Sequence, residues 1–210
     1  MRNFLLGLAG LLVGALVLAA QGSTGAVLAA ADARSHVGEA ATVCGQVADV
    51  RAPAADSEEP TLLDFEKPHP FQTFAAVIPA PVRERFGRSV QQYREKFVCV
   101  AGKIQSHQGE PRITVERSDQ LVGPFSDAPS LPAGSVLIRG QLSAEGVECQ
   151  ALQGDNGVLY TFVMSLGRQG FATGDKVAVI AVPHRGPSFC MQGRTIRVVA
   201  IAKLRDGRAD

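Results

Sequence analysis

The amino-acid sequence predicts a mainly all-β protein in which two small five-stranded β-barrels follow one another along the chain. Three segments in the first half are matched, in the same order, by three in the second. The first set is TVCGQV (42–47), FVCVAGKI (97–104) and QGEPRITV (108–115), and the second is SVLIRGQL (135–142), DKVAVIAV (175–182) and QGRTIRVV (192–199). Small closed barrels need strongly coiled strands, and a glycine within a strand allows that bend.

The first half carries its signals in the order of an oligonucleotide/oligosaccharide-binding (OB) barrel. Residues 26–36 have helix-forming composition, which Gly38 ends. Strands are expected at 42–50, 62–66, 71–78, 97–105 and 112–116, with a helical stretch inside 79–96. The OB-fold is a five-stranded, partly open Greek-key barrel, and a helix commonly lies between its third and fourth strands. We therefore expect an OB-fold domain at 27–121 with a short N-terminal helix and a helix between strands three and four.

The second half predicts a second OB-like barrel at 133–204. Its strands are expected at 135–143, 147–153, 158–166, 175–183 and 195–203, separated by turn residues such as Asn156-Gly157. Only a short glycine-containing stretch separates the third of these strands from the fourth, so no helix is expected there. Residues 122–132 are rich in proline and predict a linker between the barrels, and 205–210 predict a tail.

The N-terminus predicts export. Arg2 precedes an uncharged apolar run at 4–20, and small residues then allow cleavage before Ser23. We expect a signal peptide at 1–22, a periplasmic or secreted protein, and no membrane span after cleavage. The alternative is an uncleaved anchor, for which the run is short, since a spanning helix needs about 20 residues.

The four cysteines predict two disulfides in an exported chain, because oxidising compartments allow such bonds. Four cysteines permit three pairings. In the strand at 42–50, Cys44 points away from the face shared by Val43 and Val47, and Cys99 is likewise opposite to Val98 and Val100. These strands are antiparallel neighbours in an OB barrel, and Cα atoms of a close antiparallel pair are about 4.5 Å apart. We therefore expect the bonds Cys44–Cys99 and, within the second barrel, Cys149–Cys190.

Composition and motifs favour binding over catalysis. The formal net charge is +1, with 21 Lys/Arg against 20 Asp/Glu, and there are two tyrosines and no tryptophan. The sequence contains no GxSxG, HExxH, GxGxxG or Walker pattern, no CxxC, and no histidines at ligand spacing. We expect no catalytic residues, no metal and no cofactor, and hence no enzyme.

A basic stretch at 83–96 keeps nucleic-acid binding open as an alternative. This stretch contains three arginines, Arg83, Arg85 and Arg88, together with the aromatic residues Phe86 and Tyr93. Proteins that bind single strands combine positive charge with aromatic side chains on which bases stack. The competing interpretation is that Phe86 and Tyr93, seven residues apart, pack across the bottom of the barrel while the charges are solvated.

Both halves resemble bacterial families. ADARSHVGEAATVCGQV (31–47), LLDFEKPHPFQTFAAVI (62–78), FGRSVQQYREKFVCVAGKI (86–104) and QGEPRI (108–113) resemble a bacterial OB-fold family of exported or nucleic-acid-associated small domains. The chain departs from that family's pattern at His69, where an aromatic residue is usual, and at Phe71, where asparagine is usual. Residues 132–204, with GVECQALQGDNGVLYTF and SFCMQGRTI, are similar to a bacterial domain of unknown function in exported proteins, which implies a barrel and a cysteine pair.

A ligand is expected on the face of strands two and three of the first barrel, because OB barrels bind there between flanking loops. The turn between these strands holds two prolines, so its side chains lose little freedom on binding. The candidate ligand-binding residues are Lys67, His69, Phe71, Gln72 and His107. The alternative is a stiff hairpin whose Phe71 only caps the barrel.

These patterns together predict a non-catalytic exported binding module of the bacterial envelope. Its partner would be an envelope protein, a glycan or a small ligand. The alternative, a nucleic-acid-binding OB-fold protein, is disfavoured because an exported protein rarely meets nucleic acid.

Overall fold

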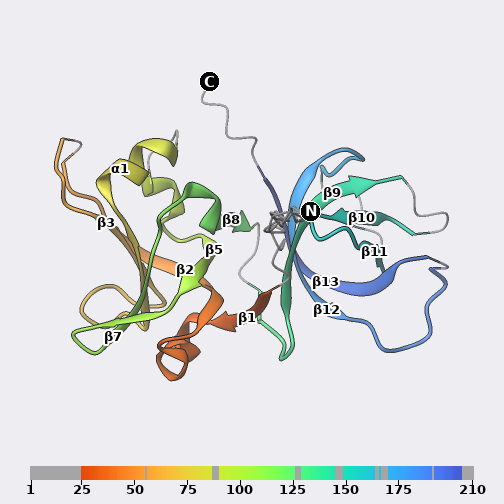
Figure 1. Cartoon of the computed structure of the whole chain (residues 1–210), viewed down its shortest axis with the longest axis horizontal. Coiled ribbons are helices and arrows are strands. Elements are labelled where there is room, and N and C mark those ends of the chain that lie inside the picture. The colour runs from red at the N-terminus through yellow and green to blue at the C-terminus, as the bar shows by residue number, and fades with distance from the viewer. Residues whose placement is uncertain are drawn as a thin grey trace, which may run out of the picture.

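The structure is a computed structural model that describes residues 25–54, 56–86, 90–125, 129–144, 149–163, 166, 170–190 and 192–204. The predicted signal peptide at 1–22 and tail at 205–210, together with Arg88, lie outside these residues. Figure 1 shows two β-barrels side by side, the first at the left and the second at the right, with strands β1 and β8 between them.

The first barrel has the OB strand order. Strands β2 (Ala40–Arg51), β3 (Thr61–Phe65) and β4 (Phe74–Ile78) form an antiparallel meander. Strand β4 then pairs in parallel with β7 (Glu110–Thr114). The barrel closes through β6 (Gln105–His107), which pairs with β7, and β5 (Phe97–Lys103), which pairs with β2. Only Ile104 separates β5 from β6, so together they act as the fourth strand of a closed five-stranded barrel.

The second barrel repeats this topology. Its strands are β9 (Val136–Ser143), β10 (Ala151–Gly154), β11 (Leu159–Phe162), β12 (Lys176–Pro183) and β13 (Arg194–Lys203). They pair in the closed order β9–β10–β11–β13–β12–β9, and only β11 and β13 are parallel. Among the described residues between β11 and β12 there is no helix. The predicted all-β fold with OB-like barrels is therefore confirmed.

Gly140, on the first strand of the second barrel, shows why that strand needs a glycine. It lies opposite Gly154 of the neighbouring strand β10. A Cβ atom at position 140 would lie 2.2 Å from the backbone oxygen of Gln153. Backbone cannot move aside as a flexible side chain can, so the strands approach this closely only because residue 140 has no side chain.

The helical segments are short. Helix α1 (Ala80–Arg83) continues into the 3-10 turn η2 (Glu84–Phe86), and a further 3-10 turn, η3, covers Val90–Tyr93. The rings of Phe86 and Tyr93 meet edge to face with centroids 6.3 Å apart, and Tyr93 is buried in the core of the first barrel. This is the arrangement expected when the two aromatic side chains close the barrel and the charges face solvent.

Two segments differ from the sequence-based expectation. The predicted N-terminal helix at 26–36 is helical only from Ala30 to His36, as the 3-10 segment η1, because Gly25–Ala29 forms strand β1. The predicted linker at 122–132 begins as strand β8 (Leu121–Phe125), which pairs with β5. The prediction from composition was wrong in both places. An alanine-rich segment and a proline-containing segment form strands here because each pairs with backbone groups of a barrel strand that is distant in the chain.

Strands β1 and β8 join the two barrels. Strand β1 pairs in parallel with β2 of the first barrel and antiparallel with β9 of the second, so one continuous sheet runs through both. The side chains between the barrels form one buried apolar cluster. We call it the interface cluster: Cys44, Phe97, Cys99, Val122, Phe125, Leu137, Ala178, Ile180 and Ala202. The guanidinium of Arg139 adds a hydrogen bond to the backbone oxygen of Asp119, and burial lowers the pKa of Arg139.

Both expected disulfides are present. Cys44 and Cys99 lie directly opposite each other on β2 and β5, with Cα atoms 4.0 Å apart, and both point away from the core of their own barrel. Cys149, just before β10, and Cys190, in the connection between β12 and β13, are linked with Cα atoms 5.6 Å apart. The first bond is buried in the interface cluster, whereas the cysteines of the second are partly exposed.

This difference in burial predicts the order of reduction. Under native conditions a thiol reductant should open Cys149–Cys190 first, because attack requires access to a sulfur atom. Cys44–Cys99 should open only when the barrels separate. Timed alkylation followed by peptide mapping measures the rate at which each disulfide opens, and equal rates would contradict the buried position of Cys44–Cys99.

Loss of the buried disulfide should also lower the stability of the fold. Relative to the unchanged protein, replacing Cys44 and Cys99 with Ala should lower the free energy of unfolding by about 4 kcal/mol.

Candidate functional site

The outer surface of strands β2, β3, β4 and β7 carries a row of polar side chains. Val50, Leu63, Phe74 and Ile113 point into the core of the first barrel. Their neighbours along each strand therefore point outward. Register partners follow one another across the four strands and so form one row, which consists of Asp49, Asp64, Ala75 and Arg112. We call this surface, with Arg51, Arg94, Thr73, Gln72 and Glu110 around the row, the polar face.

Two ion pairs hold one side of the polar face. The Nε and Nη2 atoms of Arg51 donate to the two carboxylate oxygens of Asp64 at 2.6 and 2.9 Å. The carboxylate of Asp64 is fully buried, whereas about a third of the Arg51 side chain is exposed. The hydrogen bond to Asp64 raises the pKa of Arg51, against the opposing effect of burial. The second pair joins Arg94 Nη1 to Asp49 Oδ1 at 2.6 Å.

The other side of the polar face is where the β3–β4 turn meets the β6–β7 hairpin. The Nε2 atom of Gln72 donates to Glu110 Oε2 at 2.7 Å. Glu110 is in turn the register partner of His107. The structure therefore brings together two of the five predicted ligand-binding residues, Gln72 and His107, through a residue that the sequence did not single out. The sequence does contain a pattern that could have identified Glu110 and Arg112. These two polar residues alternate with Pro111 and Ile113, which are buried.

The five predicted residues differ in exposure. Lys67, His69 and His107 are exposed, and the ring of Phe71 is 74% exposed. Phe71 was expected within a strand, but it lies in the turn before β4, where its backbone N–H donates to the carbonyl of Pro68 at 2.9 Å. The alternative in which Phe71 caps the barrel is therefore wrong. Gln72, in contrast, is buried.

Three buried side-chain atoms at this junction have no hydrogen-bond partner among the described residues. They are Gln72 Oε1, Thr73 Oγ1 and Arg112 Nε. Gln72 and Thr73 immediately precede β4, and Arg112 is the register partner of Ala75 on the adjacent β7. Buried polar atoms usually have a partner, and each one left unpaired costs about 1 to 3 kcal/mol. The two residues before β4 and the one on its paired strand β7 therefore carry buried polar atoms that ordered water or a bound group would satisfy.

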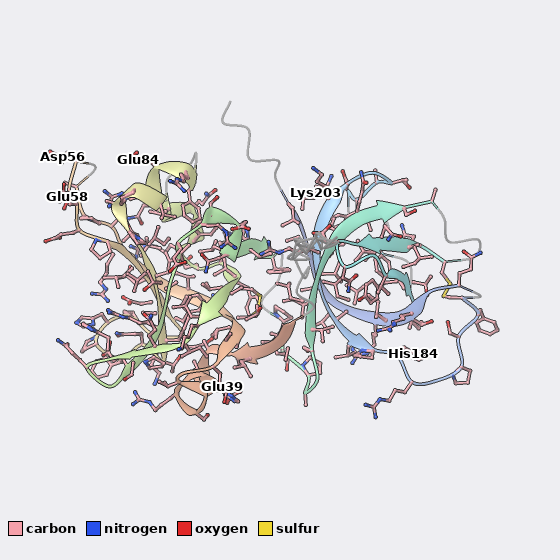
Figure 2. All side chains as sticks on the ribbon, in the orientation of Figure 1. Glu39, Asp56, Glu58, Glu84, His184 and Lys203 are labelled. Atoms are coloured by element: carbon pink, nitrogen blue, oxygen red, sulfur yellow. A yellow bond between two sulfur atoms is a disulfide. The ribbon has the colours of Figure 1, made fainter. Side chains whose placement is uncertain are left out.

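The basic stretch after β4 serves the fold. Arg83 donates to the backbone oxygens of Ser57 and Glu59 and so holds the β2–β3 loop against α1. Tyr93 is buried and offers no stacking surface. Figure 2 shows Asp56, Glu58 and Glu84 at this same end of the first barrel. A phosphate backbone would meet these carboxylates beside the arginines.

The described residues contain no group of three or more His, Cys, Asp or Glu side chains that could hold a metal ion. Among the helices in the same part of the chain, none is long and apolar enough to cross a membrane.

Comparison with known proteins gives little further information. No protein-family model and no curated protein matches the chain. Among solved structures, the chain aligns with the crystal structure of the tetrameric p202 HIN2 at 9% sequence identity, over 81% of this chain and 94% of that one. The TM-score of 0.26 is too low to carry an argument about function. The site must therefore be judged on its own geometry.

The Arg51–Asp64 pair predicts a stability difference between two matched variants. Arg51→Met leaves the buried carboxylate of Asp64 without its cation, so it should lower the free energy of unfolding by about 2 to 3 kcal/mol, somewhat less than for a fully buried pair. Arg94→Met breaks the more exposed pair and should cost about 1 kcal/mol or less. Chemical denaturation of both variants measures the difference. Equal losses would show that burial of Asp64 does not set the cost.

Proposed function

We propose that the chain is a non-catalytic, exported binding module whose ligand binds at the polar face of the first barrel. The observation that carries the proposal is the junction of Gln72, Thr73 and Arg112, whose buried polar atoms have no partner in the described residues. Lys67, His69 and Phe71 lie in the β3–β4 turn that also contains Gln72 and Thr73, and His107 lies on β6, which pairs with β7. Buried polar atoms that lack a protein partner are satisfied by ordered water or by a bound group, and we propose a bound group here.

The charge of the polar face separates this function from nucleic-acid binding. Three carboxylates, those of Asp49, Asp64 and Glu110, stand against three guanidinium groups, those of Arg51, Arg94 and Arg112. Two of the three cations are already paired. Binding to a phosphate backbone depends on cations that neutralise phosphates and release counterions. An electroneutral face supplies too few of them.

Export is supported by two observations. Arg2 precedes an uncharged apolar run at 4–20, in the pattern of a signal peptide. All four cysteines form disulfides, which persist in oxidising compartments. The compartment in turn makes envelope proteins, glycans and small molecules the available partners.

Cell fractionation tests export. When the full-length chain is expressed in a bacterium, it should reach the periplasm or the medium, begin at Ser23 by N-terminal sequencing, and contain no free thiol. Protein found in the membrane fraction with its N-terminal segment intact would favour the uncleaved anchor. Reduced protein in the cytosol would contradict export altogether.

Fluorescence anisotropy with the single-stranded DNA oligomer dT20 tests the alternative function. At about 150 mM salt we expect a dissociation constant of about 100 µM or weaker, in the range of non-specific electrostatic binding. The affinity should not change in the Arg83→Ala/Arg85→Ala variant. A submicromolar constant that this double substitution weakens would instead support a nucleic-acid-binding protein and place its contacts on the basic stretch.

A further inference from the structure

We infer that Cys149–Cys190 is a site of reversible thiol–disulfide exchange, and that a dithiol which opens this bond frees one surface loop while both barrels stay folded. The loop connects β12 to β13, and the structure describes its residues 184–190, 192 and 193. We call it the tethered loop. Figure 1 shows it at the lower right, on the side of the second barrel that faces away from the first. The exchange site is thus separate from the polar face, where we propose that a ligand binds.

The bond is accessible to a reductant in the folded protein. Cys149 and Cys190 are partly exposed, and residues 185–189, which lead to Cys190, are all exposed. In contrast, Cys44 and Cys99 are 1% and 0% exposed inside the interface cluster. A thiol must reach a sulfur atom to attack a disulfide, so only Cys149–Cys190 reacts while the barrels remain together.

Few other contacts hold the tethered loop. At its start, the backbone N–H of His184 donates to the carbonyl of Thr195 at 3.0 Å, and the His184 ring lies 3.1 Å from the carbonyl oxygen of Pro187. Within the loop, Ser188 Oγ accepts from the backbone N–H of Cys190 at 3.0 Å. Beyond these bonds, the described side chains link the loop to β13 through the hydroxyls of Ser188 and Thr195, which are 3.3 Å apart. One exposed hydrogen bond adds little stability, so the disulfide is the tether that fixes the loop.

The two cysteines are held differently. Cys149 precedes Gln150, whose backbone oxygen accepts from the N–H of Phe162 at 3.0 Å. The side-chain Oε1 of Gln150 accepts from the N–H of Leu166 at 2.6 Å. These bonds remain when the disulfide opens, so Cys149 stays in place and Cys190 moves with the tethered loop.

The core of the second barrel does not depend on the tethered loop. The buried apolar cluster of this barrel draws its members from β9 to β13 and from Leu166, and no residue of the loop belongs to it. The ladder between β12 and β13 runs from Val177 and Lys203 to Pro183 and Ile196, where the loop begins and ends. Opening the bond therefore exposes no core surface, and the change stays local.

The dithiol supplies the electrons and protons of the exchange. One of its thiolates attacks a sulfur of the bond, forms a mixed disulfide and expels the other cysteine as a thiolate. The second thiol of the reductant then displaces the remaining cysteine. The dithiol is thereby oxidised to a disulfide, and Cys149 and Cys190 are reduced to thiols by the same two electrons. The loop and the first residue of β13 carry Arg185 and Arg194 and no carboxylate, and positive charge favours a departing thiolate.

The exchange changes the surface that the loop presents. The ring of Phe189 is 91% exposed and stands next to Cys190 in the chain. With the bond closed, the ring is held beside an anchored sulfur atom, and with the bond open it moves with a free loop. A fixed apolar side chain loses less freedom on binding. The oxidised protein therefore presents a preorganised aromatic group, and the reduced protein presents a mobile one.

Reduction under native conditions followed by limited proteolysis tests this inference. The full chain with both disulfides formed is reduced with dithiothreitol, alkylated with iodoacetamide and digested briefly with trypsin. We expect alkylation at Cys149 and Cys190 alone. Cleavage after Arg185 should be about tenfold faster than in the oxidised protein, because proteolysis follows the population of open loop. Cleavage after Arg117, an exposed site on the first barrel, is the internal reference and should not change. Reoxidation with glutathione disulfide before alkylation should restore slow cleavage.

Two variants separate the disulfide from the hydrogen bond. Cys149→Ser/Cys190→Ser should be cleaved after Arg185 at the fast rate without dithiothreitol, and the methyl NMR signals of Val179, in the barrel core, should keep their positions. Ser188→Ala is the matched control, because it removes the hydroxyl link to β13 and keeps the disulfide. Its cleavage should stay slow.

Three results would overturn the inference. Equal cleavage after Arg185 before and after reduction would show that the bond does not hold the loop. Loss of the Val179 signals on reduction would show that the bond is needed for folding. Alkylation of all four cysteines together, or of none, would show that Cys149–Cys190 does not exchange in the folded protein. If the double variant does not fold, reduction of the unchanged protein still decides between these outcomes.

Discussion

The structure depends on the burial of one outward-facing surface, the side of strands β2 and β5 that carries the Cys44–Cys99 bond. In an isolated barrel this surface would face solvent. Here Val122 and Phe125 of β8 and side chains of β9, β12 and β13 cover it, and the disulfide lies inside the resulting apolar cluster. Burying apolar surface contributes about 25 cal/mol per Å², which matters most for small domains with thin cores.

Strand β1 adds a backbone connection to this side-chain interface. It gives hydrogen bonds to the first barrel through β2 and to the second through β9. Gly25 and Ala26 pair with β9, and Val27 to Ala29 pair with β2, so neither barrel can leave without breaking one of these two ladders. The two barrels therefore behave as parts of one unit, and the repeated topology along the chain does not mean two independent domains joined by a flexible connection.

The surface used for assembly differs from the polar face, where we propose that a ligand binds. On the polar face, strands β2, β3, β4 and β7 place charged and polar side chains in register across the sheet. Ion pairs neutralise most of the charge, as in Arg51–Asp64. Among the described residues, the buried side-chain atoms without a partner belong to Gln72 and Thr73 in the β3–β4 turn and to Arg112 on β7. A rigid sheet that carries a few unpaired groups is a preorganised surface, which lowers the cost of binding.

The sequence by itself determined the elements whose signals are local. The alternation of Val43, Cys44 and Val47 set which side of the strand is apolar, and the order of strands then predicted the Cys44–Cys99 bond. It also pointed to the β3–β4 turn, since prolines restrict the backbone of their own residue and of the one before. Only the tertiary structure decided that 25–29 and 121–125 are strands, because their partners are distant in the chain. The same holds for the candidate site. Gln72 is buried, and the Nε atom of Arg112 has no partner among the described residues, because of neighbours on other strands. No local pattern encodes which polar atom a distant residue leaves without a partner.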